Sequence, residues 1–148
     1  MSGQGQYCTF VLNGQHFGID AVKVQEVIRQ ADMTRVPLAP PAVRGLINLR
    51  GQIVTAIDLR RRLDMPDRAS TEAPVSVVIQ TDDGPVSLLV DEIGDVLELL
   101  SENFEPPPET LRGPTRTVTI GVSKLDGRLL LLLDTEKVLR FDNGNQLN

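Results

Sequence analysis

Short apolar runs separated by turn-forming residues make up most of this chain of 148 residues. Runs of this length, rich in β-branched residues, favour strands over helices. The run at 7–12, the pair Asn13-Gly14 and the run at 16–19 predict a β-hairpin, because Asn-Gly readily adopts the positive φ angles of a type I′ turn. Further strands are predicted at 52–57, 75–80, 86–90, 117–122 and 128–133. The pattern therefore predicts a mostly antiparallel β protein.

Helices are predicted to be few and short. Segments 58–63 and 134–139 each begin with an aspartate that can cap a helix N-terminus. Segment 40–45 begins with proline and ends with glycine, which is typical of a single helical turn. Residues 64–74, which include two prolines, are predicted to be a linker.

The chain also contains an internal repeat. Residues 45–63, shifted by 76 positions, lie on residues 121–139 with five identities in nineteen positions, where chance gives about one. A second match joins residues 17–20 to residues 88–91, 71 positions further on. The five identities are Gly45/Gly121, Leu49/Leu125, Gly51/Gly127, Asp58/Asp134 and Leu63/Leu139.

Two copies are too few for a solenoid, so they are expected to form two pseudo-symmetric subdomains that share a core. We predict a single domain over residues 1–148, with the first subdomain mainly at 7–68 and the second mainly at 75–139. Residues 1–6 and 142–148 are predicted to be disordered tails. The repeated glycines and aspartates are predicted to serve turns and caps: Gly45, Gly51, Asp58, Gly121, Gly127 and Asp134.

One position in the repeat changes its charge. The residue before the turn glycine is Arg50 in the first copy and Asp126 in the second. A positive φ angle disfavours arginine, but a type I turn with only Gly51 in the left-handed region would avoid that cost. We interpret Arg50 as a residue that serves a partner or an internal pair with a carboxylate.

Charge is distributed unevenly along the chain. The net charge of −5 argues against a broad nucleic-acid surface. Residues 29–68 contain eight arginines and four aspartates, whereas residues 82–109 contain nine acidic residues and no lysine or arginine. This asymmetry fits a protein that docks partners on oppositely charged faces. Solvated faces that differ in charge would give the same pattern.

Residue patterns for catalysis, metal binding and cofactor binding are absent from the sequence. The only histidine, His16, lies beside the predicted hairpin turn, and the only cysteine, Cys8, occupies a strand position typical of a buried apolar residue. No nucleotide-binding motif is present. Four aspartates at strand ends suit turns and caps: Asp20, Asp58, Asp91 and Asp134. We predict no enzymatic activity, no metal and no cofactor.

The single cysteine suits a reducing compartment. The sequence shows neither an 18-residue apolar run nor a signal peptide. We therefore expect a cytoplasmic protein that does not insert into a membrane.

The motifs of the chain, in their order, resemble those of the CheW family of chemotaxis coupling proteins. The resemblance covers residues from about Tyr7 to Leu139. It rests on Phe17-Gly-Ile-Asp20, Val24-Gln-Glu-Val-Ile28, Thr34-Arg-Val-Pro37, Pro40, Gly45-Leu-Ile-Asn-Leu-Arg-Gly51, Asp58-Leu-Arg60, Val90-Asp91 and Gly121-Val122.

The resemblance implies an all-β fold of two five-stranded SH3-like barrels packed side by side, with a few short helices. It also implies a scaffold without catalytic activity that couples the cytoplasmic tip of methyl-accepting chemoreceptors to the regulatory domain of the histidine kinase CheA. The receptor tip is a helical hairpin and is expected in the groove between the barrels. The kinase-binding residues stay unassigned.

By the same resemblance, the receptor-side residues are Val24, Glu26 and Arg50, with Ile93 and Val96 on the opposite groove wall. Any of the apolar ones could instead belong to the core. Because Glu26 and Arg50 are the charged members of two motifs, we hypothesise that they form an ion pair at the groove edge.

Two other classes of function stay open at this point. A small-ligand-binding regulatory protein would hold its ligand in the cleft between the subdomains. A hydrolase would require two carboxylates that face each other across a cleft.

Overall fold

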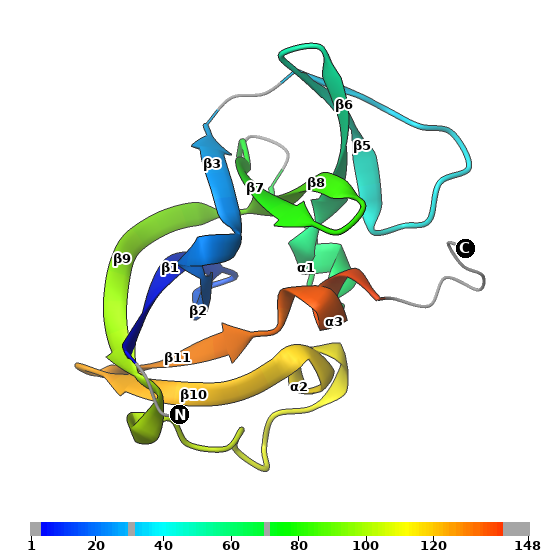
Figure 1. Cartoon of the computed structure of the whole chain (residues 1–148). Coiled ribbons are helices and arrows are strands. Elements are labelled where there is room, and N and C mark those ends of the chain that lie inside the picture. The colour runs from blue at the N-terminus through cyan, green and yellow to red at the C-terminus, as the bar shows by residue number, and fades with distance from the viewer. Residues whose placement is uncertain (1–3, 30–31, 70–71, 141–148) are drawn as a thin grey trace.

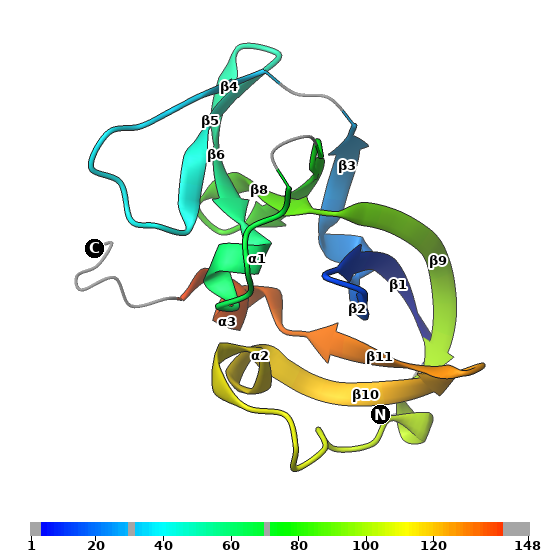
Figure 2. The ribbon, with the colours of Figure 1, turned by 180° about the vertical axis from the view of Figure 1, so that it is seen from behind.

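The computed structural model describes residues 4–29, 32–69 and 72–140. Two β-sheets, each curled into a small barrel, lie side by side with short helices at their junction (Figures 1 and 2). The predicted all-β class with two SH3-like barrels and a few short helices is confirmed. Five strands were predicted for each barrel, and the second sheet has six because it includes the two-residue strand β4 (Met33–Thr34).

The first sheet has five strands in the order β10-β11-β2-β1-β9. Its strands are β1 (Gln4–Leu12), β2 (Gln15–Asp20), β9 (Glu92–Leu100), β10 (Thr119–Leu125) and β11 (Arg128–Leu133). The predicted hairpin is confirmed, because Asn13 and Gly14 both have positive φ angles, of 49° and 78°, between β1 and β2. Beyond β9, Glu105 pairs with Val122 of β10 through two backbone hydrogen bonds of 2.8 Å, which closes the barrel.

The second sheet has six strands in the order β3-β7-β8-β6-β5-β4. Its strands are β3 (Val24–Ile28), β4 (Met33–Thr34), β5 (Val43–Leu49), β6 (Gln52–Asp58), β7 (Val75–Thr81) and β8 (Gly84–Val90). The pairs β6–β8 in this sheet and β11–β2 in the first sheet are parallel, and all the others are antiparallel. The two barrels thus have matching topology.

The division of the chain between the barrels corrects the predicted boundaries. Residues 7–68 do not form one barrel and residues 75–139 the other, because β1 and β2 pair with β9, β10 and β11, while β7 and β8 pair with β3, β5 and β6. Each repeat therefore gives its first hairpin to the barrel that contains the later strands of the other repeat. Turn residues predict which strands form a hairpin, but not which sheet that hairpin joins.

The two sheets share one hydrophobic core. A single cluster of buried side chains contains Phe10, Phe17 and Leu131 from the first sheet and Val77 and Leu88 from the second. The rings of Phe10 and Phe17 stack with centroids 5.8 Å apart. Because the exchanged hairpins bury their apolar faces in this cluster, the barrels are expected to unfold together.

The helices are short, and two of them follow the predicted caps. α1 (Leu59–Arg62) and α3 (Thr135–Leu139) begin directly after Asp58 and Asp134, whose side chains accept hydrogen bonds from the first-turn backbone. α2 (Gly113–Val118) was not predicted, and it takes the first two residues of the strand expected at 117–122. The described residues also contain two single 3₁₀ turns, η1 (Ala21–Lys23) and η2 (Ser101–Asn103).

Some local predictions need correction. The predicted single turn of segment 40–45 is present only over residues 40–43, closed by a 2.9 Å hydrogen bond from the Val43 amide to the Pro40 carbonyl. Residues 43–45 already belong to β5, because pairing with β6 outweighs local helix preference. Residues 4–6 of the predicted N-terminal tail are part of β1, where they pair with residues 98–100 of β9. Residues 1–3 and 142–148 of the predicted tails lie outside the described residues.

Candidate functional site

The β5–β6 turn places Arg50 in a strained backbone conformation. Arg50 and Gly51 have φ angles of 52° and 86°, so both central residues of the turn lie in the left-handed region. The type I alternative, with only Gly51 there, is therefore wrong. The Asn48 Oδ1 accepts a 2.9 Å hydrogen bond from the Gly51 amide and holds the turn. Since arginine disfavours this region, another interaction must stabilise Arg50 there.

That interaction is a bidentate ion pair with Glu26 on β3. The Arg50 Nη1 donates to Glu26 Oε1 at 3.1 Å, and the Arg50 Nη2 donates to Glu26 Oε2. The hydrogen bond from Arg50 holds the pKa of Glu26 below its ordinary value. The Arg50 side chain is 68% exposed and that of Glu26 is 25% exposed, so the pair presents its cation to solvent.

The pair also joins segments that lie far apart in the second sheet. β3 is an edge strand of that sheet, and β5 lies four strands away from it. Ile28, also on β3, packs against the buried cluster of Leu49, Val54 and Val78. The ion pair between Glu26 and Arg50 and the apolar contact of Ile28 therefore both join β3 to the β5–β6 hairpin.

A polar chain runs from this pair along the barrel surface. Gln25 donates from its Nε2 to Glu26 Oε2 at 3.5 Å, and Gln80 of β7 donates to the Gln25 Oε1. Gln25 and Arg50 thus both donate to the Oε2 atom of Glu26. The carboxylate orientation is thus determined by two neighbouring strands and a turn.

The remaining predicted receptor-side residues lie on edge strands. Val24 of β3 pairs with Ile79, and Val96 of β9 pairs with Cys8. Cys8 and Ile79 are 71 positions apart, which is also the spacing of the second repeat match. Since Val96 pairs with Cys8 and Val24 pairs with Ile79, Val24 and Val96 occupy equivalent places in the two copies. Val96 is 57% exposed.

Val24 and Ile93 are half-buried and pack against the shared core. Their contacts leave each side chain only part of its surface for a partner. Of the three apolar residues predicted on the receptor side, Val96 is therefore the most accessible.

Three exposed apolar side chains in this region escaped the sequence analysis. Val22 is 87% exposed on η1, Val27 is 37% exposed on β3, and Ile53 is 60% exposed on β6. Scattered exposed aliphatics are ordinary, but these flank the elements that carry Glu26 and Arg50. Valine and isoleucine are usually buried, so the sequence carried no signal that these three side chains would be exposed.

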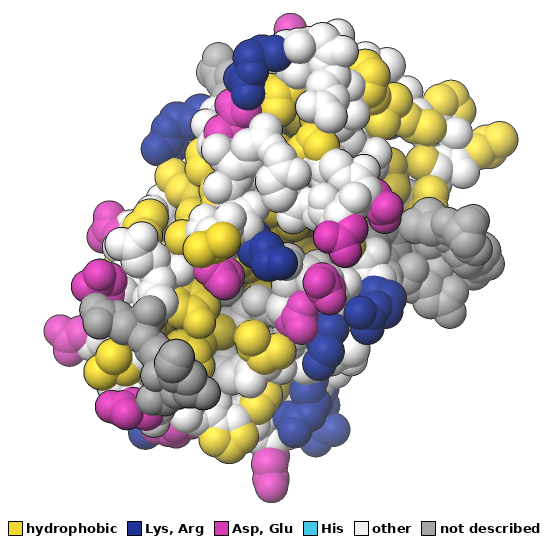
Figure 3. Space-filling model, viewed as in Figure 1, with side chains coloured by type: hydrophobic (Ala, Val, Ile, Leu, Met, Phe, Trp, Pro, Cys, Tyr) yellow, Lys and Arg dark blue, Asp and Glu magenta, His cyan; other side chains and the backbone are white. Residues whose placement is uncertain are grey.

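Acidic side chains surround the other edge strand. Figure 3 shows them gathered over β9, interleaved with apolar side chains. Along this strand Glu92, Asp95 and Glu98 are exposed, as is Val96. The surface around Val96 is thus negatively charged, whereas the surface around Arg50 carries an exposed cation.

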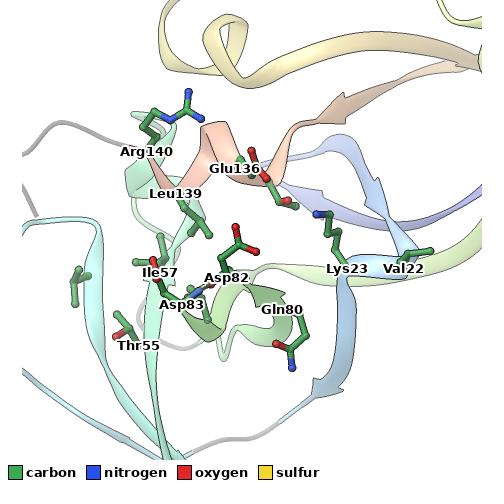
Figure 4. A pocket seen from close by; sticks show the side chains of 14 residues that line it. Val22, Lys23, Thr55, Ile57, Gln80, Asp82, Asp83, Glu136, Leu139 and Arg140 are labelled. Carbon is green, nitrogen blue, oxygen red and sulfur yellow. Dashed lines mark hydrogen bonds between the residues drawn. The ribbon is translucent and has the colours of Figure 1, made fainter. Parts of the chain in front are cut away.

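A cleft of about 720 Å³ opens between the second sheet and α3. Its apolar lining includes Val43, Ile57, Val86 and Leu139. Charged residues from three separate parts of the chain line the same space: Lys23 from η1, Asp82 and Asp83 from the β7–β8 turn, and Glu136 and Arg140 from the C-terminal segment, with the Arg140 guanidinium pointing away from it (Figure 4). We call this space the inter-barrel cleft.

The inter-barrel cleft is a different surface from the predicted receptor side. None of Val24, Glu26, Arg50, Ile93 and Val96 lines it. The polar chain reaches it at one point, because Gln80 is also a lining residue.

A buried ion-pair network lies where the two sheets meet. The Asp58 side chain is 1% exposed and pairs with Arg44 at 2.9 Å and with Arg68 at 3.3 Å. Asp91, at the β8–β9 junction, pairs with Arg60 at 2.5 Å and with Arg68 at 3.1 Å. Arg68 lies in the segment predicted as a linker, so this segment contributes to the interior.

Asp91 also connects the two barrels. It accepts a 2.8 Å hydrogen bond from the Asn13 amide in the β1–β2 turn. Burial pushes the pKa of Asp91 upward, but the hydrogen bonds from Arg60, the Asn13 amide and Arg68 outweigh it, and the pKa lies below its ordinary value. The ionised carboxylate therefore holds together the first hairpin, the β8–β9 junction and α1.

The described residues offer little chemistry for catalysis. They include no group of three or more histidine, cysteine, aspartate or glutamate side chains that could hold a metal ion. Cys8 is buried, and burial raises the pKa of its thiol, which makes it a poorer nucleophile. Among the described helices none is long and apolar enough to cross a membrane.

The CheW-like domain model matches residues 6–142 of the chain. The chain is 34% identical over 134 residues to the chemotaxis protein CheW of Klebsiella aerogenes, covering 90% of this chain and 81% of that protein. It is 33% identical over 130 residues to the chemotaxis protein CheW of Bacillus subtilis, covering 88% and 83%.

A solved structure shares the fold. The scaffolding protein TtCheW from Thermoanaerobacter tengcongensis superimposes with a TM-score of 0.85 at 24% identity, covering 98% of each chain. The arrangement of two barrels is thus common to both proteins.

Proposed function

Since this chain belongs to the family defined by the CheW-like domain, we propose that it is a non-catalytic chemotaxis scaffold that couples chemoreceptors to the histidine kinase CheA. In this role it binds the cytoplasmic tip of a methyl-accepting receptor and the regulatory domain of the kinase. It works in the cytoplasm, at receptor arrays on the inner face of the membrane.

The Glu26–Arg50 pair is the observation that carries the receptor side of this proposal. The pair is bidentate and holds an exposed guanidinium in one orientation, at the expense of a disfavoured backbone angle. Val27 on β3 and Ile53 near the start of β6 are exposed aliphatic side chains close in sequence to Glu26 and Arg50. An oriented cation beside apolar side chains suits the surface of an amphipathic helix, and the receptor tip is expected to be helical.

A binding experiment tests both partners together. The purified protein is immobilised and exposed separately to the cytoplasmic fragment of a receptor and to CheA from the same organism. The variant Arg50→Glu is the test sample and Arg128→Glu is its matched control, because Arg128 is exposed on the other barrel. We expect the wild type and the control to retain both partners, and Arg50→Glu to retain only CheA.

Two results would contradict the proposal. Failure of the wild type to bind either partner would remove the coupling function. Equal receptor binding by Arg50→Glu and the wild type would remove the assigned surface and leave the coupling function standing.

The inter-barrel cleft supports a second candidate function, the binding of a small regulatory ligand. Its volume of about 720 Å³ lies within the range of ligand pockets, roughly 300–1,000 Å³. Screening a metabolite library by NMR tests it, since a ligand in the cleft should shift the amide signals of Thr55, Gln80 and Leu139 in a saturable way. A library that leaves these signals unchanged would count against this candidate.

A further inference from the structure

A second, smaller cavity is lined by three arginines. It has a volume of about 190 Å³ and lies between the loop that follows β4, the start of β5 and α1. Its charged lining residues are Arg35, Arg44 and Arg61, and it has no acidic lining residue. The proline pair Pro40-Pro41 forms part of its wall, which stiffens the loop around it.

The three arginines differ in how their charge is compensated. Arg44 donates to Asp58 from its Nη1. Arg61 donates to Asp67 at 3.0 Å from its Nε, and at 3.3 Å to the Pro41 carbonyl from its Nη1. Arg35 is exposed and has no hydrogen bond or ion pair within the part of the chain that the structure describes.

The carboxylates behind the cavity are shared among more arginines than they can neutralise. Asp58 also pairs with Arg68, which pairs in turn with Asp91, and Asp91 pairs with Arg60. This connected network contains four arginines, 44, 60, 61 and 68, and three aspartates, 58, 67 and 91. Glu72 also interacts electrostatically with Arg60. With Arg35, which lines the cavity, five arginines and four carboxylates lie in and behind it, an excess of one positive charge.

We propose that this cavity binds the phosphate group of a small ligand, either as free phosphate or as a phosphate monoester. A phosphate monoester carries between about 1.5 and 2 negative charges at pH 7, opposite in sign to the excess positive charge at the cavity. Guanidinium groups donate paired hydrogen bonds to phosphate oxygens. The cavity has room for one such group, and Arg35 has its donors free for it among the described residues.

The experiment follows the arginine side chains directly. The Nε–Hε signals of the ¹⁵N-labelled protein are recorded by NMR at pH 7 while inorganic phosphate replaces sodium chloride at constant ionic strength. We expect saturable shifts at Arg35, Arg44 and Arg61 in the wild type. The variant Arg35→Gln should bind phosphate roughly tenfold more weakly, because one charge-assisted contact is lost.

The control is Arg128→Gln, which removes the same charge from an exposed position on the other barrel. It should bind phosphate like the wild type. Because Arg35 is exposed and unpaired among the described residues, its replacement should leave the backbone amide spectrum outside the loop unchanged.

Two further titrations, with methyl phosphate and with acetate, identify the chemical group that the cavity binds. Methyl phosphate binding as tightly as inorganic phosphate would show that the site accepts a monoester, and binding of inorganic phosphate alone would identify the free ion as the ligand. Acetate should bind at least about tenfold more weakly than phosphate, because it carries one charge and two oxygens.

The proposal is overturned by shifts that do not saturate, by equal phosphate affinity in Arg35→Gln and the wild type, or by acetate binding as tightly as phosphate. It does not depend on the coupling function, since its readout needs neither receptor nor kinase.

Discussion

The two copies of the β-hairpin and helix unit share a backbone design but differ in what their side chains do. In both β5–β6–α1 and β10–β11–α3, an aspartate caps the helix. In both, a glycine lies at a register shift of the strand pair, where the backbone of another segment comes close to it. The first copy adds a buried carboxylate network and the exposed pair of Glu26 and Arg50. The comparison teaches that the topology comes from the repeat, whereas charged side chains distinguish the two barrels.

The aspartate caps give the largest expected contrast. Asp58 pairs with the buried Arg68 and the half-buried Arg44 besides capping α1, whereas the Asp134 side chain accepts from the Glu136 and Lys137 amides. Asp58→Ala should lower the free energy of unfolding by about 3–5 kcal/mol because it breaks the buried pair with Arg68 and removes the carboxylate that compensates Arg44. Asp134→Ala should cost about 1 kcal/mol, the usual value of a cap.

Urea denaturation of both variants measures this difference. If Asp58→Ala fails to fold, Asp58→Asn provides the milder comparison, since it removes the charge and keeps the shape. Equal losses at the two positions would show that the buried network adds nothing to the cap.

The repeated glycines give the next contrast. A Cβ on Gly45 would lie 2.5 Å from the Thr34 carbonyl oxygen and 2.8 Å from the Met33 Cγ, whereas one on Gly121 would lie 3.3 Å from the Glu105 carbonyl oxygen. Gly45→Ala should therefore cost about 1–3 kcal/mol and displace β4, and Gly121→Ala should cost less than about 1 kcal/mol. Thermal unfolding of the two variants tests the order, and a larger loss at Gly121 would contradict it.

Acid titration tests the ion pair that only the first copy has. Arg50 lowers the pKa of Glu26 from its ordinary value of 4.5. A carboxylate with a lowered pKa stabilises the folded state at pH values above the ordinary one, and this stabilisation is lost as pH falls through the lowered pKa. The Glu26 carboxyl signal, followed by NMR, should titrate below 4.5 in the wild type and return toward that value in Arg50→Gln. An unchanged midpoint in Arg50→Gln would mean that the pair does not form in solution.

The smallest expected effect is on the stability of the β5–β6 turn. Arg50→Asn would give this turn the Asn-Gly pair of the β1–β2 hairpin, which tolerates positive φ angles. Relief of the backbone strain should offset the loss of the ion pair, so the urea midpoint should stay nearly unchanged. A large decrease would show that Arg50 matters mainly for folding.

Sequence predicted this fold well where the signal was local. Asn13-Gly14 identified a hairpin, and Asp58 and Asp134 marked two helix starts. The strands β3, β4, β5 and β9 were not predicted. The apolar residues of β3, β5 and β9 do not alternate cleanly, β3 and β9 pair with strands far away in sequence, and β4 has only two residues. The exchange of hairpins between the barrels has no local signature, since it depends on which long-range pairs form.

The candidate site was likewise predictable from the sequence only in part. Glu26 and Arg50 could be paired from their motifs, and the structure places their side chains in contact. Periodicity could not reveal the network around Asp58 and Asp91, because capping accounts for an aspartate at a strand end without any arginine partner. Arg68 was not identified either, because it lies in a segment whose prolines predict a linker.

The central claim is that the receptor binds the first copy at the turn that carries Arg50. The most direct test compares this turn with the equivalent turn of the second copy, which carries Asp126. The affinity of the receptor cytoplasmic fragment is measured for the wild type, for Arg50→Glu and for Asp126→Lys, which reverses the charge at the equivalent turn of the second copy. We predict that Arg50→Glu weakens binding at least about tenfold and that Asp126→Lys changes it less than about twofold. Equal effects at the two turns, or an effect at Asp126 alone, would contradict the assignment of the receptor surface to the first copy.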